Sequence, residues 1–127
     1  MPFFHVWFAT KNRKWLLDGD VSERAKSVML EVAATKQINV IELETMIDHV
    51  HILLEAPTSS DLSWSLKLIK GRVAYEVFRS FPERKLDAHV NSLWQKGFNS
   101  RIVPPGQVPI VRRYTRTQDQ RLEKHER

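Results

Sequence analysis

The sequence predicts an α+β protein with a ferredoxin-like fold, a split βαβ sandwich that has one antiparallel sheet with two helices on one face. Three observations predict it. Segments with strand and helix patterns follow one another in the order β-α-β-β-α-β-α, and the first six match that sandwich. A length of 127 residues suits one domain. The chain has no cysteine, which excludes disulfides and thiolate metal sites, and at this length it can bury a core without them.

Each segment is assigned from residue spacing and from its boundaries. Strands are rich in aromatic and β-branched residues, helices repeat apolar residues every three to four positions, and prolines mark the ends. The predicted elements are a strand at 4–10, a helix capped by Ser22 and running to about residue 36, strands at 38–45 and 49–56 joined by a hairpin turn, a helix at 61–78 that breaks at 81–84, a strand at 98–103 and a helix from about Pro109 onward.

The seventh element has no place in a six-element sandwich. One sheet face is free of helices, so we expect the C-terminal helix to lie there. The chain is then a single domain, with a ferredoxin-like core at 1–106 and a helix with its tail at 107–127. No apolar run approaches the ~20 residues needed to span a membrane. The apolar start lacks a basic segment and a cleavage site, so we interpret it as a strand and not as a signal peptide. The absence of cysteine fits a reducing compartment, and we expect a cytoplasmic protein.

Charge is divided unevenly along the chain. The net charge is +5. Residues 1–60 carry six Lys and Arg against eight Asp and Glu, and residues 61–127 carry fourteen against seven. A basic half on a globular domain indicates a polyanionic partner, with nucleic acid the first candidate, although a solvated surface rich in basic residues gives the same count.

Two histidines stand two positions apart in the predicted third strand. Alternate strand residues face opposite sides of a sheet, so His49 and His51 project together while Val50 and Ile52 point into the core. Neutral imidazole is a common ligand of divalent cations. A cation site and a merely polar strand face are both compatible with this pair alone.

Tyr114 and Gln118 stand four positions apart in the predicted last helix and therefore share one face. A phenol can attack phosphorus as a nucleophile, and an amide oxygen suits a hard cation. Three arginines surround the tyrosine, which suits an approaching phosphate; they are Arg112, Arg113 and Arg116. A surface helix with a half-buried tyrosine is the alternative.

Five motifs, in order along nearly the whole chain, resemble those of one family. They are residues 4–11, the segment 46–54 around the histidine pair, residues 68–72, residues 93–98 and the tyrosine segment 113–118. The sequence resembles the single-tyrosine HUH transposases of small bacterial insertion sequences, often called TnpA, and the repeat-associated tyrosine transposases. Ile47 replaces a usual proline and Phe98 a common tyrosine, and neither is a proposed ligand or nucleophile.

The resemblance implies an activity, a cofactor and a partner. His49, His51 and Gln118 would hold Mg²⁺ or Mn²⁺, and Tyr114 would form a 5′-phosphotyrosine with single-stranded DNA whose ends fold into hairpins. The family acts as a homodimer, in which the tyrosine helix often serves the partner's histidines. Candidate contacts to DNA phosphates are Lys67, Lys70, Arg72, Arg112, Arg113 and Arg116.

Two other functions stay open at this stage. A non-catalytic nucleic-acid-binding domain of the same fold would read unpaired bases with the sheet face. A domesticated relative that acts on chromosomal repeat hairpins would use the same chemistry. The remaining histidines, His5, His89 and His125, are assigned to structure or surface, and Trp7, Trp15 and Trp94 to the core or a dimer contact.

Overall fold

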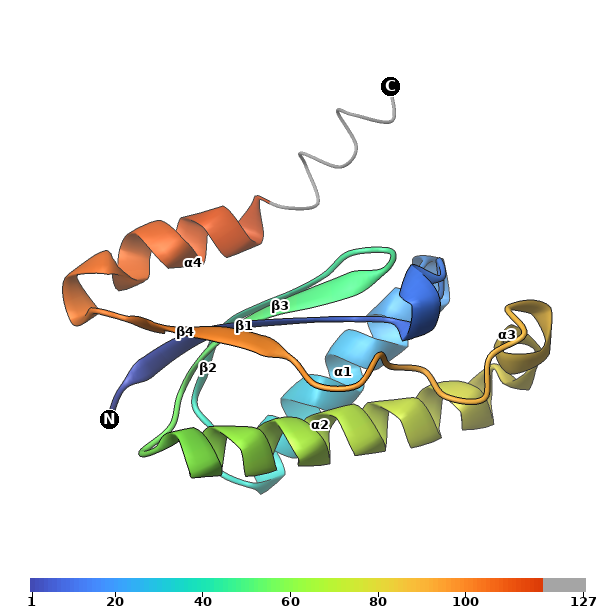
Figure 1. The fold of residues 1–127 in the computed structure, drawn as a ribbon, viewed down its shortest axis with the longest axis horizontal. Helices are drawn as coiled ribbons and strands as arrows, with labels where there is room; N and C mark the ends of the chain where they lie inside the picture. Colours follow the sequence, from blue (N-terminus) through green and yellow to red (C-terminus); the bar gives the residue numbers. More distant parts are fainter. Residues whose placement is uncertain (118–127) are drawn as a thin grey trace.

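A four-stranded antiparallel sheet forms the centre of the molecule (Figure 1). The computed structural model describes residues 1–117. Its elements are β1 (Phe3–Ala9), η1 (Lys11–Arg13), α1 (Gly19–Thr35), β2 (Val40–Thr45), β3 (His49–Glu55), α2 (Ser59–Ser80), α3 (Pro82–Asp87), β4 (Asn99–Val103), η2 (Pro105–Gln107) and α4 (Val108–Arg116).

The strands lie in the order β2-β3-β1-β4, and all neighbours are antiparallel. This is the order of a split βαβ sandwich, so the predicted fold class is confirmed. β1 and β3 are the two central strands, and Trp7 pairs with His51 while Ala9 pairs with His49. The register therefore places the histidines beside the C-terminal half of β1.

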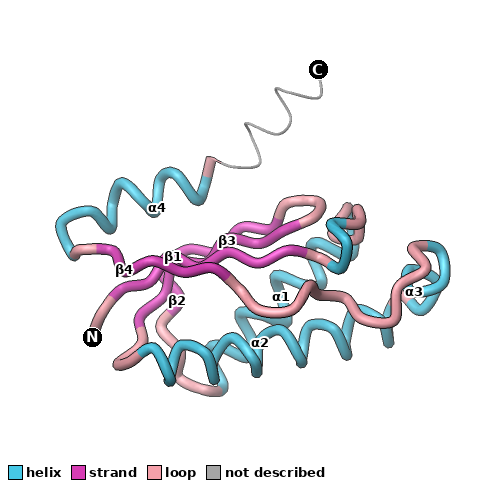
Figure 2. Tube along the Cα trace, in the orientation of Figure 1, coloured by secondary structure: helices cyan, strands magenta, loops and turns pink. Residues whose placement is uncertain are grey.

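One face of the sheet is covered by α1 and α2, which lie below it in Figures 1 and 2. Alternate residues of the central strands point into this layer, including Val6, Phe8, Val50 and Ile52. The main core between sheet and helices is thus filled by β-branched and aromatic side chains. The opposite residues of the same strands, the histidines among them, face away from it.

The other face of the sheet carries α4, which lies above it in Figure 1. Val111 packs on Leu53 of β3 and on Val103 of β4 in a second, smaller apolar cluster. The expectation that the C-terminal helix covers the face left free by α1 and α2 is confirmed. This docking brings the tyrosine helix over the strand face that presents the histidines.

Several boundaries differ from the predicted ones. Ser22 does not cap α1, because the helix begins at Gly19 after Asp18, and the Ser22 hydroxyl instead bonds to Thr45. β2 begins at Val40, where its pairing register with β3 shifts. The break predicted at 81–84 coincides with α3, a short helix with a proline in its first turn. In residues 1–117, no helix is long and apolar enough to cross a membrane.

Candidate active site

His49 and His51 project from the same face of β3, as their spacing predicts. Their ring centroids are 5.0 Å apart. Val50 and Ile52, on the other face, are completely buried in the main core. Burial of these two neighbours fixes the strand, and the strand in turn fixes the direction of both imidazoles.

The Nδ1 atoms of both imidazoles have polar partners. His49 Nδ1 lies 2.7 Å from Asp48 Oδ1, and His51 Nδ1 lies 3.0 Å from His5 Nε2. With Nδ1 protonated and donating in each ring, both Nε2 atoms carry the lone pair that binds a cation. Such outer hydrogen bonds orient ligand histidines in metal sites and raise their basicity. The two rings therefore meet the requirements of a pair of nitrogen ligands.

His5 belongs to this cluster, although the sequence analysis assigned it only to structure or surface. It lies on β1, only 3% exposed, and its ring stacks on His51 at 5.2 Å between centroids. Burial and, to a smaller extent, the positive charge of Arg101 together lower the pKa of His5 to about 4. His5 shares the strand face of Trp7, and that alternation was the available sequence signal.

His51 is also neutral at physiological pH. It is 8% exposed. Burial, followed by the charges of His49 and His5, lowers the pKa of His51 to about 4. Neutral imidazole is the protonation state that binds metal ions. A cation at this site would therefore not have to displace a proton from His51.

Tyr114 lies above the histidines on α4. Its ring is edge-on to His51 at 6.2 Å and to His5 at 6.1 Å between centroids. Val111 and Thr115, on the helix face that meets the sheet, are buried, whereas Tyr114 is 39% exposed. A hollow of about 430 Å³ lies beside Tyr114; it is lined by His5, Trp7, His51, Arg101 and Tyr114. The phenol thus lies beside the histidine pair of its own chain.

Glu42 of β2 anchors α4 through two arginines. Its Oε2 is 3.0 Å from both Arg112 Nε and Arg116 Nη2. Burial raises the pKa of the Glu42 carboxyl, but the hydrogen bonds and charges of the two arginines outweigh it and leave the pKa below its usual value. The charges of Arg112 and Arg116 are therefore shared with Glu42, whereas Arg113 is exposed.

The basic residues of α2 are not close to Tyr114, because α2 covers the opposite face of the sheet (Figure 1). Lys67 is exposed. Lys70 Nζ donates to the carbonyls of Gln95 and Gly97, and Arg72 pairs with Glu76. DNA contacts by these residues stay a prediction, and such contacts would belong to a different surface from the site.

Of the three proposed cation ligands, the structure describes His49 and His51. Gln118 lies outside the described residues. Within residues 1–117, no group of three His, Cys, Asp or Glu side chains is placed to hold a metal ion. His5 does not act as a third ligand, because its Nε2 is bonded to His51. The cation site with His49, His51 and Gln118 therefore stays a prediction from the sequence.

Trp7 and Trp15 are not in the core, which leaves the dimer contact as a prediction for both. Trp7 is half-buried and lines the hollow beside Tyr114, and Trp15 is 68% exposed. Trp94 is buried, as predicted. An aromatic side chain beside the reacting groups offers a flat apolar surface on which a base can stack.

Comparison with known proteins agrees with this geometry. Residues 3–118 match the family model described as "Transposase IS200 like". Because the match spans most of the chain, the protein belongs to the IS200-like transposase family. It is 28% identical over 115 residues to the ISDra2 transposase TnpA of Deinococcus radiodurans, covering 91% of this chain and 82% of that protein. It is 25% identical over 95 residues to the IS200 transposase of Salmonella typhimurium, covering 75% of this chain and 62% of the relative.

Three solved structures share the fold. A candidate transposase from Deinococcus radiodurans R1 matches with a TM-score of 0.73 and 27% identity, covering 93% of this chain and 92% of its own. A repeat-associated tyrosine transposase bound to a REP hairpin matches with a TM-score of 0.60 and 13% identity, covering 90% and 62%. A designed protein with a ferredoxin fold matches at 0.50 and 17% identity, covering 82% and 87%.

Proposed function

We propose that this transposase cleaves and rejoins single-stranded DNA at hairpin-marked element ends through a covalent 5′-phosphotyrosine on Tyr114. The observation that carries the proposal is the hollow in which Tyr114 faces His51 at 6.2 Å between ring centroids. A nucleophile beside the buried, neutral imidazole of His51 suits phosphoryl transfer assisted by a cation. The structural relative bound to a REP hairpin supports a hairpin substrate for this chain.

The reaction exchanges one phosphodiester for another. The Tyr114 oxygen, after losing its proton, bonds to phosphorus, and the bond from phosphorus to the 3′-oxygen breaks. That oxygen takes up a proton and leaves as a 3′-hydroxyl. Attack by a 3′-hydroxyl on the phosphotyrosine reverses these events and rejoins the strand. No bond energy is lost to hydrolysis, so no external energy source is required.

We assign a Mg²⁺ or Mn²⁺ ion to His49, His51 and Gln118. When bound, the ion would polarise a phosphodiester oxygen as a Lewis acid. Asp48 and His5 would hold the two imidazoles in the orientation that exposes each Nε2. Arg101, exposed and lining the same hollow, offers a positive charge to the DNA phosphate.

A covalent-trapping assay tests this proposal. The protein is incubated with Mn²⁺ and labelled single-stranded hairpin oligonucleotides from the flanks of its gene, then analysed on denaturing gels. We expect an adduct that requires the cation and is absent with duplex DNA. Tyr114→Phe should bind DNA without forming the adduct, and His49→Ala should lose cleavage but keep the fold. Normal cleavage by Tyr114→Phe would remove Tyr114 from the reaction.

A non-catalytic nucleic-acid-binding domain is the alternative function. The aromatic and basic lining of the hollow favours it, because Trp7 and Arg101 would serve binding without chemistry. Tight hairpin binding by the wild type with no adduct under any divalent cation would support this alternative.

A further inference from the structure

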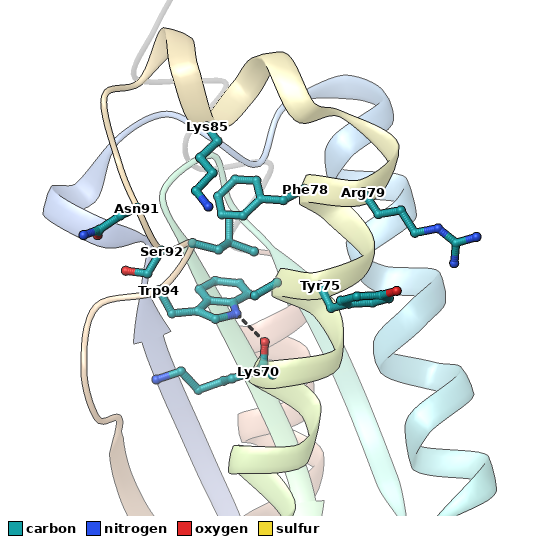
Figure 3. A pocket seen from close by; sticks show the side chains of 11 residues that line it. Lys70, Tyr75, Phe78, Arg79, Lys85, Asn91, Ser92 and Trp94 are labelled. Atoms are coloured by element: carbon teal, nitrogen blue, oxygen red, sulfur yellow. Dashed lines mark hydrogen bonds between the residues drawn. The ribbon is translucent and has the colours of Figure 1, made fainter.

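A second hollow, larger than the one under Tyr114, lies on the helical side of the molecule (Figure 3). It has a volume of about 540 Å³ and lies between the C-terminal half of α2, α3 and the segment 91–94. We call it the α2–α3 groove. Its lining includes Lys70, Phe78, Lys85, Asn91, Ser92 and Trp94.

Aromatic rings form the wall of the α2–α3 groove. Trp94 is held in place because its Nε1 donates to the Lys70 carbonyl at 2.9 Å. Phe78 is half-buried against the core, and the Nζ atom of Lys85 lies 5.7 Å from its ring centroid. Figure 3 shows Phe78 on α2 and Trp94 on the neighbouring segment, with Ser92 and Asn91 next to Trp94. This wall is fixed by packing before any ligand binds.

The charge around the α2–α3 groove is positive. Lys70, Arg79 and Lys85 line it, and the adjoining hollow, which shares Lys85 and Asn91, adds Lys11. Among the described lining residues of both hollows there is no Asp or Glu. A surface of fixed aromatic rings with ammonium groups and no carboxylate matches the requirements of single-stranded nucleic acid.

Lys70 retains binding capacity despite its structural bonds. Its Nζ donates to the carbonyls of Gln95 at 3.1 Å and Gly97 at 2.7 Å. Burial lowers the pKa of Lys70. An ammonium group has three donors, so a third remains after these two bonds. Lys85 is exposed at the opposite edge. The two lysines therefore flank the aromatic wall.

The segment around Gln95 connects the α2–α3 groove to the candidate active site. The backbone N–H of Gln95 donates to the Ala9 carbonyl at 2.9 Å, and Ala9 pairs with His49 in the sheet. The Thr10 amide donates to the Asp48 carbonyl at 2.9 Å. The C-terminal end of β1 thus lies between the histidines and the groove.

We propose that the α2–α3 groove binds an unpaired deoxynucleotide of the DNA substrate, outside the hairpin stem. The base stacks on Phe78 in place of the Lys85 ammonium, which then contacts a phosphate. The edge of the base meets Trp94, and Asn91 and Ser92 form hydrogen bonds with it. The inference rests on the proposed function for the identity of the polymer. It adds a second contact surface and gives a role to basic residues that lie away from Tyr114.

The test compares two hairpins by fluorescence anisotropy in EDTA, where no chemistry occurs. One hairpin is blunt, and the other carries a single-stranded extension. We expect the wild type to bind the extended hairpin about tenfold more tightly, in the range that stacking of one base supplies. Lys85→Glu and Phe78→Leu should each remove most of this difference and leave the affinity for the blunt hairpin unchanged.

Lys36→Glu is the matched control, because Lys36 is also exposed, lies at the C-terminal end of α1 and does not line the α2–α3 groove. For the extended hairpin, the plot of log affinity against log salt concentration should be shallower in Lys85→Glu than in the wild type. The magnitude of its slope should be smaller by ~0.7, the value for one phosphate contact on a single strand. Equal weakening by Lys36→Glu and Lys85→Glu would overturn the inference. Parallel loss of blunt and extended binding in Lys85→Glu and Phe78→Leu would also overturn it.

The inference and the proposed function fail in different assays. Loss of the Tyr114 adduct in the wild type, with extension-dependent binding intact, would reject the proposed function and keep the groove as a DNA-binding site. A normal adduct on both hairpins, with no affinity gain from the extension, would reject the groove and keep the function.

Discussion

Replacement of His5 by phenylalanine tests whether this buried histidine orients a cation ligand. His5 Nε2 is 3.0 Å from His51 Nδ1, and both residues are at most 8% exposed. His5→Phe keeps an aromatic ring on β1 but removes the acceptor. The Nδ1 proton of His51 is then buried without a partner, which costs about 1–3 kcal/mol of unfolding free energy.

Part of that cost is offset within the same variant. Among the described residues, His5 Nδ1 is buried with no hydrogen-bond partner, so its removal relieves a desolvation cost. We therefore expect a net loss of about 1 kcal/mol in urea unfolding. The larger effect should be on cation affinity, because loss of an outer hydrogen bond to a ligand histidine weakens metal binding about 10–100-fold.

Two readouts separate orientation from packing in His5→Phe. Adduct yield is measured against Mn²⁺ concentration, and stability is measured without a cation. His5→Gln should restore part of the Mn²⁺ affinity, because its amide oxygen can accept from His51 Nδ1. An unchanged Mn²⁺ dependence in His5→Phe, together with reduced stability, would refute the assignment of His5 as a positioning residue.

Three further predictions concern α4, acid stability and the origin of the active site. Glu42→Gln removes both ion pairs that hold α4 and should weaken the docking of α4 by about 1 kcal/mol. Trypsin should then cut within α4 about fivefold faster. Glu83→Gln, on the exposed helix α3, is the control and should not change the cleavage rate. His5 and His51 have pKa values of about 4 in the folded protein and 6.5 in the unfolded chain. The unfolding free energy should therefore fall as pH drops from 6.5 to about 4, by up to ~1.4 kcal/mol per pH unit for each histidine. A flat profile over this range in denaturant titrations would contradict the burial of both histidines as neutral groups. Tyr114 faces His51 of its own chain. A mixture of the Tyr114→Phe protein and the His49→Ala protein should therefore form no adduct. Adduct formation in the mixture would show that α4 serves the partner's histidines.

The sequence alone predicted the fold through local periodicity. Alternation in β1 and β3 marks which residues face the helices, and helical spacing marks α1 and α2. The same period of two placed His49 and His51 on one face, since that relation depends on strand geometry only. Start positions were less well predicted, because Asp18 rather than Ser22 precedes α1 and tertiary contacts engage the Ser22 hydroxyl.

Only the tertiary structure decided which distant residues share the site. His5 is 46 positions from His51 in sequence, yet strand pairing brings the two rings into contact, and no local pattern specifies that pairing. The docking of α4 depends on Glu42 and on a small apolar cluster, so the partners of Arg112 and Arg116 became known only from the packed molecule. Residue spacing determines the face on which a side chain lies, whereas its neighbours depend on how separate elements pack.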